Sequence, residues 1–173
     1  MMTSKKKTLA AAGMTAFFTV MILAGVGVCF ETNDDRIFVE FLSGSLTGSP
    51  DAHAIYLNYL LSWPLMVLYR VTPSVPWYGL FLIASHCTAL FLILRNILAV
   101  LETKEGTIRG IFLCVGLLLA DIYLFSQIQF TSTAALLAIA GYSCVLSGRR
   151  DLKRLLLFLY WSFWPCCCAA IPC

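Results

Sequence analysis

Residues 110–147 read GIFLCVGLLLADIYLFSQIQFTSTAALLAIAGYSCVLS and form one long apolar stretch with a single charged residue, Asp121. Polar side chains gather in its middle, at SQIQ (126–129) and TST (131–133). An apolar helix needs about 20 residues to cross the hydrocarbon layer of a bilayer, which is ~30 Å thick. The stretch is therefore long enough for two spans, and its polar middle predicts a tight turn between them.

The composition extends this interpretation to the whole chain. Of its 173 residues, 60% are hydrophobic and 12% are charged, whereas soluble domains average about 25% charged residues. The net charge is only +3, and no stripe of basic and aromatic residues indicates nucleic-acid binding. The sequence predicts an all-α, polytopic protein of the cell membrane whose partner is the lipid bilayer.

Five transmembrane helices and two external juxtamembrane helices are expected. The expected order is a cytoplasmic N-terminus (1–7), a first span (8–30), an external loop (31–77), a second span (78–94), a cytoplasmic loop (95–109), two further spans (110–130 and 131–147), a basic cytoplasmic loop (148–154) and a fifth span (155–173). The first apolar run is longer than the ~7–15 residues of a signal-peptide core, so it is interpreted as a retained anchor.

Charge decides whether the short apolar segment 54–69 crosses the membrane. Cytoplasmic loops are enriched in Lys and Arg. If the N-terminus is cytoplasmic and the segment stays outside, only Arg36 and Arg70 of the 12 basic residues lie outside. If the segment crosses and the N-terminus is cytoplasmic, the basic residues after it change sides and most of the positive charge lies outside. If it crosses and the N-terminus is outside, most of the positive charge lies inside, but the three lysines at 5–7 lie outside. The first arrangement is therefore expected.

The first external helix is expected over residues 35–42. Asn33 or Asp34 is suited to cap its N-terminus. Arg36 and Glu40 are expected to pair at i,i+4 on the face opposite an apolar stripe, as in a helix that lies on a membrane surface.

The second external helix is expected over residues 52–69. The sequence SPD (49–51) is typical of a helix start, because it supplies a cap, a proline at the first position and an acid in the first turn.

The acidic motif TNDD (32–35), the surface helix after it and the sequence SPDAH (49–53) resemble the first external loop of the GT-C class of multi-pass glycosyltransferases. The stretch 32–81 is also similar to a group of uncharacterised bacterial membrane proteins. The resemblance covers roughly the first half of the chain. It implies the N-terminal part of an enzyme that moves a sugar from a polyprenyl-phosphate donor to an extracytoplasmic acceptor.

The same resemblance implies roles for individual residues. Asp35 is the expected catalytic base for the acceptor hydroxyl, and Asp34 is the second candidate. Arg36, Asp51 and His53 are expected at the substrate, where Arg36 and His53 would bind phosphate oxygens. No cofactor is expected, although adjacent carboxylates also suit a divalent cation. A structural interpretation stays open, in which these acids only cap and solvate helix ends.

Asp121 is a further candidate for substrate binding, because it lies in the middle of an expected span. An acid there costs about 2.5–3.5 kcal/mol on insertion scales. It is expected to face the interior of the helix bundle, with His86 or a tyrosine hydroxyl as its partner. A packing role for the residue is an equal alternative.

Two other classes of function remain open. One is a small scaffold or subunit that assembles with a membrane-protein partner. The other is a transporter of a lipid-linked saccharide, in which Asp121 and His86 would line the path. Complete GT-C enzymes have more spans, so the fifth span is expected to be truncated and a donor site built from later spans is expected to be missing.

Overall fold

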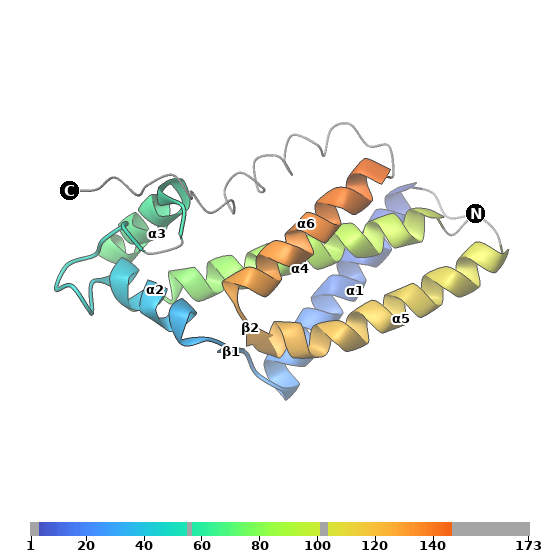
Figure 1. Cartoon of the computed structure of the whole chain (residues 1–173). Helices are drawn as coiled ribbons and strands as arrows, with labels where there is room; N and C mark the ends of the chain where they lie inside the picture. Colours follow the sequence, from blue (N-terminus) through green and yellow to red (C-terminus); the bar gives the residue numbers. More distant parts are fainter. Residues whose placement is uncertain (1–3, 55–56, 101–103, 147–173) are drawn as a thin grey trace.

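The structure is a computed structural model that describes residues 4–54, 57–100 and 104–146 (Figure 1). In chain order these residues form α1 (Ser4–Gly25), β1 (Cys29–Phe30), α2 (Asn33–Ser43), α3 (Tyr59–Val71), α4 (Trp77–Val100), α5 (Lys104–Ser126), β2 (Gln127–Ile128) and α6 (Phe130–Leu146). The expected all-α class is confirmed, with one short strand pair that was not expected.

Among the described residues, three helices are long and apolar enough to cross a membrane, at residues 4–25, 77–99 and 106–126. α6 is equally apolar but shorter over its described residues. The basic loop at 148–154 and the fifth span at 155–173 lie outside the described residues, so a total of five spans stays a prediction.

α1 ends at Gly25, five residues before residue 30, where the first span was expected to end. Gly27 has a φ of 83°, a left-handed conformation that glycine adopts without steric cost. Its N–H donates to the carbonyl of Ile22 (2.8 Å), which closes the last turn of the helix. The chain then continues as the extended strand β1.

α1 and α4 run antiparallel, as contacts at both ends of the pair show. At one end, Lys7 Nζ donates to the carbonyl of Ala99 (3.1 Å). At the other end, the rings of Phe30 and Tyr78 lie 5.9 Å apart. The chain therefore leaves α1 and enters α4 at the same end of the bundle, where α2 and α3 lie (Figure 1). The side of the membrane that this end faces stays a prediction.

The strands β1 and β2 join the ends of α1 and α5. They pair in parallel, with Cys29 opposite Gln127 and Phe30 opposite Ile128. The N–H of Glu31 extends the pairing to the carbonyl of Ile128 (3.3 Å). The expected turn after α5 is therefore present. It contains β2, which hydrogen-bonds β1 and the start of the 31–77 segment.

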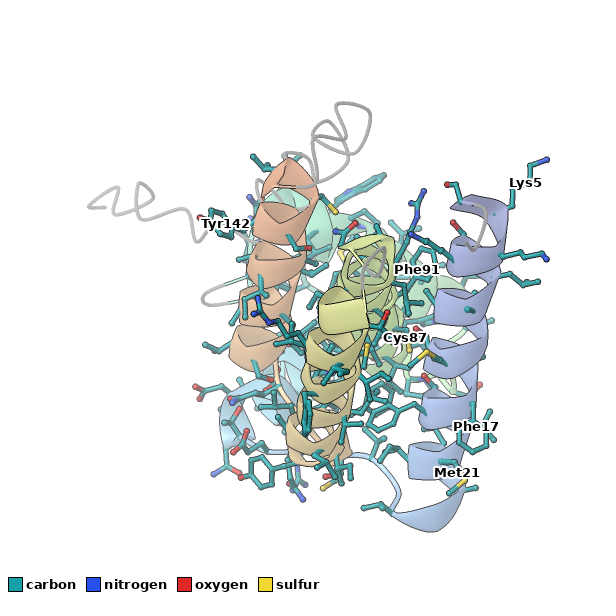
Figure 2. The ribbon with its side chains drawn as sticks, turned by 90° about the vertical axis from the view of Figure 1, so that its right-hand side faces the viewer. Lys5, Phe17, Met21, Cys87, Phe91 and Tyr142 are labelled. Carbon is teal, nitrogen blue, oxygen red and sulfur yellow. The ribbon has the colours of Figure 1, made fainter. Side chains whose placement is uncertain are left out.

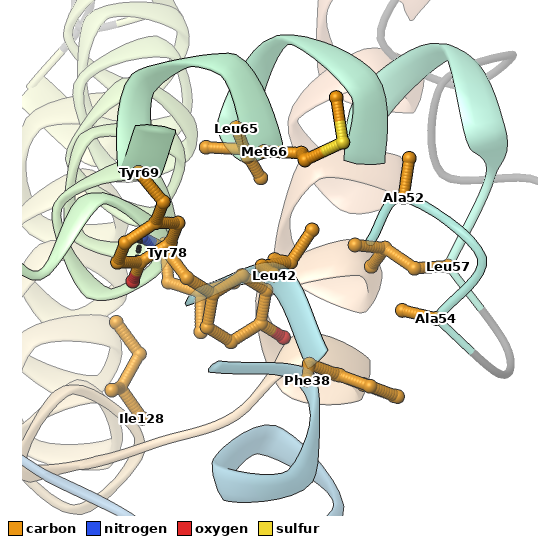
Figure 3. Packing of buried hydrophobic residues seen from close by; sticks show 11 residues of the cluster. Phe38, Leu42, Ala52, Ala54, Leu57, Leu65, Met66, Tyr69, Tyr78 and Ile128 are labelled. Carbon is orange, nitrogen blue, oxygen red and sulfur yellow. Dashed lines mark hydrogen bonds between the residues drawn. The ribbon is translucent and has the colours of Figure 1, made fainter. Parts of the chain in front are cut away.

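A distinct apolar core lies beneath α2 and α3 (Figure 3). Its buried residues come from α2, α3, the loop between them, the start of α4 and β2: Phe38, Leu42, Ala52, Ala54, Leu57, Leu65, Met66, Tyr69, Tyr78, Leu82 and Ile128. We call the segment 31–76 the end layer. Because its apolar face is buried against the bundle, the end layer is held in one position.

The second external helix begins later than expected, at Tyr59 instead of residue 52. The Asp51 carboxylate accepts the N–H of His53 (2.9 Å), an Asx-type turn that competes with helix formation. Asn58 is the actual cap, and its side chain accepts the N–H of Leu60 (2.9 Å). The expected cap of the first helix was also wrong, since Thr32 occupies that position.

α4 is the central helix of the bundle. Half of its span is buried (50%), compared with 17% for α1 and 22% for α5. Figure 2 shows Phe17 and Met21 of α1 and Tyr142 of α6 pointing away from the bundle, and all three are exposed. Such outward apolar surfaces are typical of helices that have lipid around them.

Candidate functional site

Asp35 lies in the first turn of α2 and is almost fully buried, with 2% of its surface exposed. Its Oδ2 accepts the Thr32 hydroxyl (2.8 Å). Its Oδ1 accepts both the Tyr78 hydroxyl (2.6 Å) and the N–H of Phe130 (3.1 Å). One carboxylate therefore joins the end layer to the starts of α4 and α6.

These three donors explain how a carboxylate can stay buried there. A buried acid without partners would lose its hydration and gain nothing in return. Three hydrogen bonds replace the lost hydration of the two Asp35 oxygens. Because both oxygens of Asp35 are engaged and covered, the geometry suits the residue to positioning the end layer.

Tyr78 is surrounded by the end layer. Its ring lies 5.9 Å from the rings of Phe30 and Phe38, and its N–H donates to the Tyr69 hydroxyl (3.1 Å). Figure 3 shows Tyr78 close to Tyr69 and Phe38. Burial raises the pKa of Tyr69 above its ordinary value of 10.0, and the hydrogen bond from Tyr78 only partly opposes this. Tyr69 therefore stays a neutral phenol at physiological pH.

Asp34 and Arg36 lie beside Asp35 in sequence but face outward. Both are exposed. Arg36 Nε lies 3.5 Å from Glu40 Oε1, which confirms the expected i,i+4 pair. Asp34 is in the first turn of α2, where the helix dipole favours negative charge. Of the two adjacent carboxylates, Asp34 is the one that a substrate in water can reach.

Asp51 and His53 form a second exposed group. Asp51 Oδ1 lies 2.7 Å from His53 Nδ1. The pKa of Asp51 is lowered from its ordinary value, first by the N–H of His53 and then by the His53 ring. The ring also lies 5.3 Å from that of Tyr59. Nearby, Arg70 Nη2 donates to the carbonyl of Pro50 (3.3 Å).

The two exposed groups lie at opposite ends of α2. The N–H of Asp51 donates to the carbonyl of Phe41 (3.0 Å), near the C-terminus of the helix. Asp34 lies seven residues earlier, which corresponds to about 10 Å along the helix axis. The structure therefore does not bring Asp34 and Arg36 into direct contact with Asp51 and His53.

Asp121 has the partner that its sequence position required. His86 Nε2 lies 2.7 Å from Asp121 Oδ1, and the two residues are 0% and 1% exposed. The pair joins α4 to α5. It is separate from the end layer and does not contact Asp34 or Asp35.

Sequence reasoning missed Tyr78 and Thr32 as partners of Asp35. Thr32 lies three residues before Asp35, a spacing that allows a local hydrogen bond at a helix start. The signal for Tyr78 was weaker, because a Trp-Tyr pair at the start of a span is typical of an interfacial anchor.

The metal hypothesis has no geometric support within residues 4–54, 57–100 and 104–146. No three His, Cys, Asp or Glu side chains in these ranges lie close enough together to hold a metal ion. The adjacent carboxylates of Asp34 and Asp35 also differ, since one is exposed and the other is enclosed by donors.

No protein-family model, curated protein or solved structure matches this chain. Its assignment therefore rests on its own residues: the described part of the chain is all-α, with three helices able to span a membrane and an end layer attached through Asp35.

Proposed function

We propose that this chain is the N-terminal membrane module of a glycosyltransferase of the GT-C type, which moves a sugar from a polyprenyl-phosphate donor to an extracytoplasmic acceptor. One observation carries the proposal. An acid-bearing helix directly follows the first candidate span, lies against the end of the bundle and exposes Asp34 and Arg36. Such a surface can meet a donor held in lipid and an acceptor in water.

Asp34 is the catalytic base in this proposal, and Asp35 is a positioning residue. The acceptor hydroxyl gives its proton to the Asp34 carboxylate as its oxygen bonds to the anomeric carbon of the sugar. The bond between that carbon and the donor phosphate breaks, and the lipid phosphate leaves with the bonding electrons. Asp35 keeps α2 in place through Tyr78 and Phe130, so that Asp34 stays at the rim of the bundle.

Phosphate binding falls to Arg36 first. Its guanidinium is exposed two residues after Asp34, and it can form paired hydrogen bonds with phosphate oxygens. His53 and Asp51 are candidates for a second contact with substrate, at a place about 10 Å from Asp34 along α2. In this proposal the bilayer is the partner. The end layer lies on the extracytoplasmic side of the membrane, and the N-terminus lies in the cytoplasm.

The test uses the full chain in liposomes that contain a radiolabelled polyprenyl-phosphate sugar and a panel of hydroxyl acceptors. Because the part of the donor site that later spans build is expected to be missing, we expect weak but saturable donor binding through Arg36 and slow transfer of label to an acceptor. Asp34→Asn should lower transfer by about 10²–10⁴-fold and leave donor binding intact. Glu31→Gln, which neutralises another exposed acid at the same end, is the matched control and should leave transfer unchanged.

Binding of the donor without transfer would assign the chain to the donor-binding part of a larger enzyme. Absence of both would overturn the proposal.

A transporter of a lipid-linked saccharide is the second candidate, and the buried His86–Asp121 pair is the observation that favours it. Ionisable residues within spans often mark transport paths. Asp121→Asn would then abolish movement of the donor between leaflets, while Asp34→Asn would not. A scaffold would show neither loss, and Asp121→Asn would instead weaken assembly with its partner.

A further inference from the structure

His86 and Asp121 are two ionisable side chains in contact within the apolar interior of the bundle. Their side chains are 0% and 1% exposed, and Nε2 of the histidine lies 2.7 Å from Oδ1 of the aspartate. The Phe125 ring stands edge-on to the imidazole at 4.9 Å, and Phe18 of α1 packs edge-on against Phe125 at 6.5 Å. The pair is therefore buried, with the Phe125 ring against the imidazole.

Other charged groups are far from the pair along every helix of the bundle. α1 has no charged residue after Lys7, and α6 has none. Arg95 lies nine residues after the histidine on α4, and Arg109 lies twelve residues before the aspartate on α5, which is about 14 Å and 18 Å of helix. The nearby titratable group is the Cys87 thiol, which hydrogen-bonds a threonine of α1. The pair must therefore balance its own charge.

We propose that His86 and Asp121 form a proton-binding site that retains one shared proton and so has no net charge throughout the neutral pH range. Removing that proton would leave a carboxylate beside a neutral imidazole, and adding another would leave an imidazolium beside a carboxylic acid. Either state places an uncompensated charge among apolar groups, which burial strongly disfavours. The inference holds whether or not the chain transfers a sugar.

A second observation points to proton binding rather than to packing alone. His86 Nδ1 and Asp121 Oδ2 are buried and have no hydrogen-bond partner among the described residues. Buried polar atoms in purely structural pairs are normally satisfied. A pair with one shared proton is either an imidazolium beside a carboxylate or an imidazole beside a carboxylic acid. In both forms Nδ1 carries a hydrogen and Oδ2 is an acceptor. These two atoms are therefore where a water molecule can deliver or remove the proton.

The pair lies nearer to the end layer than to the opposite end of the bundle. His86 is nine residues from the start of α4, and Asp121 is five residues from the end of α5. These separations correspond to about 14 Å and 8 Å along the helices. The proton is therefore exchanged with the side of the membrane that the end layer faces.

The experiment exploits the presence of only two histidines in the chain. In His53→Gln protein labelled with ¹⁵N-histidine and ¹³C-aspartate and placed in liposomes, every imidazole signal belongs to His86. We expect no titration step over about pH 5–9, with spectra of either an imidazolium beside a carboxylate or an imidazole beside a carboxylic acid. Adding Asp121→Asn should convert the ring to neutral imidazole over the whole range. Asp34→Asn is the control and should change nothing at His86.

A neutral imidazole beside an ionised carboxylate, or a single step near the ordinary histidine pKa of about 6.5, would overturn the proposal. The spectrum of the His53→Gln parent decides this by itself, so the result does not depend on the folding of the Asp121 variant.

Discussion

The Tyr78 hydroxyl donates a 2.6 Å hydrogen bond to Asp35 Oδ1 across 43 positions of sequence. This contact attaches the end layer to the central helix α4. The same oxygen accepts the N–H of Phe130 at the start of α6. The position of α2, and with it the exposed carboxylate of Asp34, therefore depends on one buried acid.

A double-mutant cycle on this contact should show strong coupling. Asp35→Ala and Tyr78→Phe should each lower the free energy of unfolding by about 1–3 kcal/mol, because each removes the buried hydrogen bond and leaves its partner unsatisfied. The double variant should lose less than the sum, with a coupling energy of about 0.5–3 kcal/mol. Denaturant unfolding in micelles gives all four values.

The matched control for this cycle is Tyr123→Phe. The Tyr123 hydroxyl makes the same kind of bond, to Glu31 Oε1 at 2.9 Å, but on the exposed surface. Its loss should change stability by no more than about 0.5 kcal/mol. Equal effects at the buried and exposed sites would contradict the proposed role of Asp35.

Two glycines in the end layer should differ in their tolerance of alanine. Gly44 and Gly48 both have left-handed backbones, with φ of 81° and 79°. A Cβ at Gly44 would collide with the backbone of Ser49 and Pro50, whereas a Cβ at Gly48 would meet open space. Gly48→Ala should cost about 1 kcal/mol from its conformation alone.

Gly44→Ala should cost at least about 2 kcal/mol more than Gly48→Ala, because the end layer must also shift to relieve the collision. Thermal unfolding of the two variants measures the difference. Similar melting temperatures would mean that the turn after α2 is not packed as described.

Asp51 should titrate below its ordinary pKa of 3.8. Its pKa is depressed in the folded state, so its favourable contribution to folding is present above 3.8 and is lost as the pH falls through the lower, folded value. His53→Gln should raise the pKa only partly, since the N–H of residue 53 is the larger cause and remains. A ¹³C-aspartate titration tests this, and an unperturbed Asp51 in the parent protein would refute it.

Arg70 and Arg109 should lie on opposite sides of the membrane. Both side chains are exposed, Arg70 at the end of α3 and Arg109 near the start of α5. In a variant whose native cysteines are replaced by serine, Arg70→Cys should react with an impermeant maleimide in intact cells. Arg109→Cys should react only after permeabilisation. Labelling of both residues from one side would contradict the topology.

Several elements could be predicted from the sequence because their signals are local. Arg36 and Glu40 are four residues apart on one helix, so they pair wherever that helix lies. The polar residues after Ser126 interrupt an apolar run and mark a turn. His86 was one of the two kinds of partner expected for Asp121, the other being a tyrosine hydroxyl, because an acid in a span needs a partner.

The start of α3 shows where local signals misled. The sequence at 49–51 suits a helix start, but the carboxylate of Asp51 binds the His53 N–H instead. Two cap signals, at Asp51 and at Asn58, compete within one stretch of chain. In the fold, Ala52 and Leu57 are buried in one cluster with Phe38 and Leu42 of α2, a tertiary contact that the local sequence does not record.

The sequence by itself determined that the chain has apolar helices long enough to cross a bilayer, that an acidic segment follows the first of them and that Asp121 requires an interior partner. These properties follow from composition, helix length and the cost of a charge in hydrocarbon. Only the tertiary structure decided that Asp35 is enclosed while Asp34 stays exposed, because Tyr78 and the N–H of Phe130 lie 43 and 95 positions away. Hydrogen bonds over such separations form only once the helices have packed, so no local pattern records them.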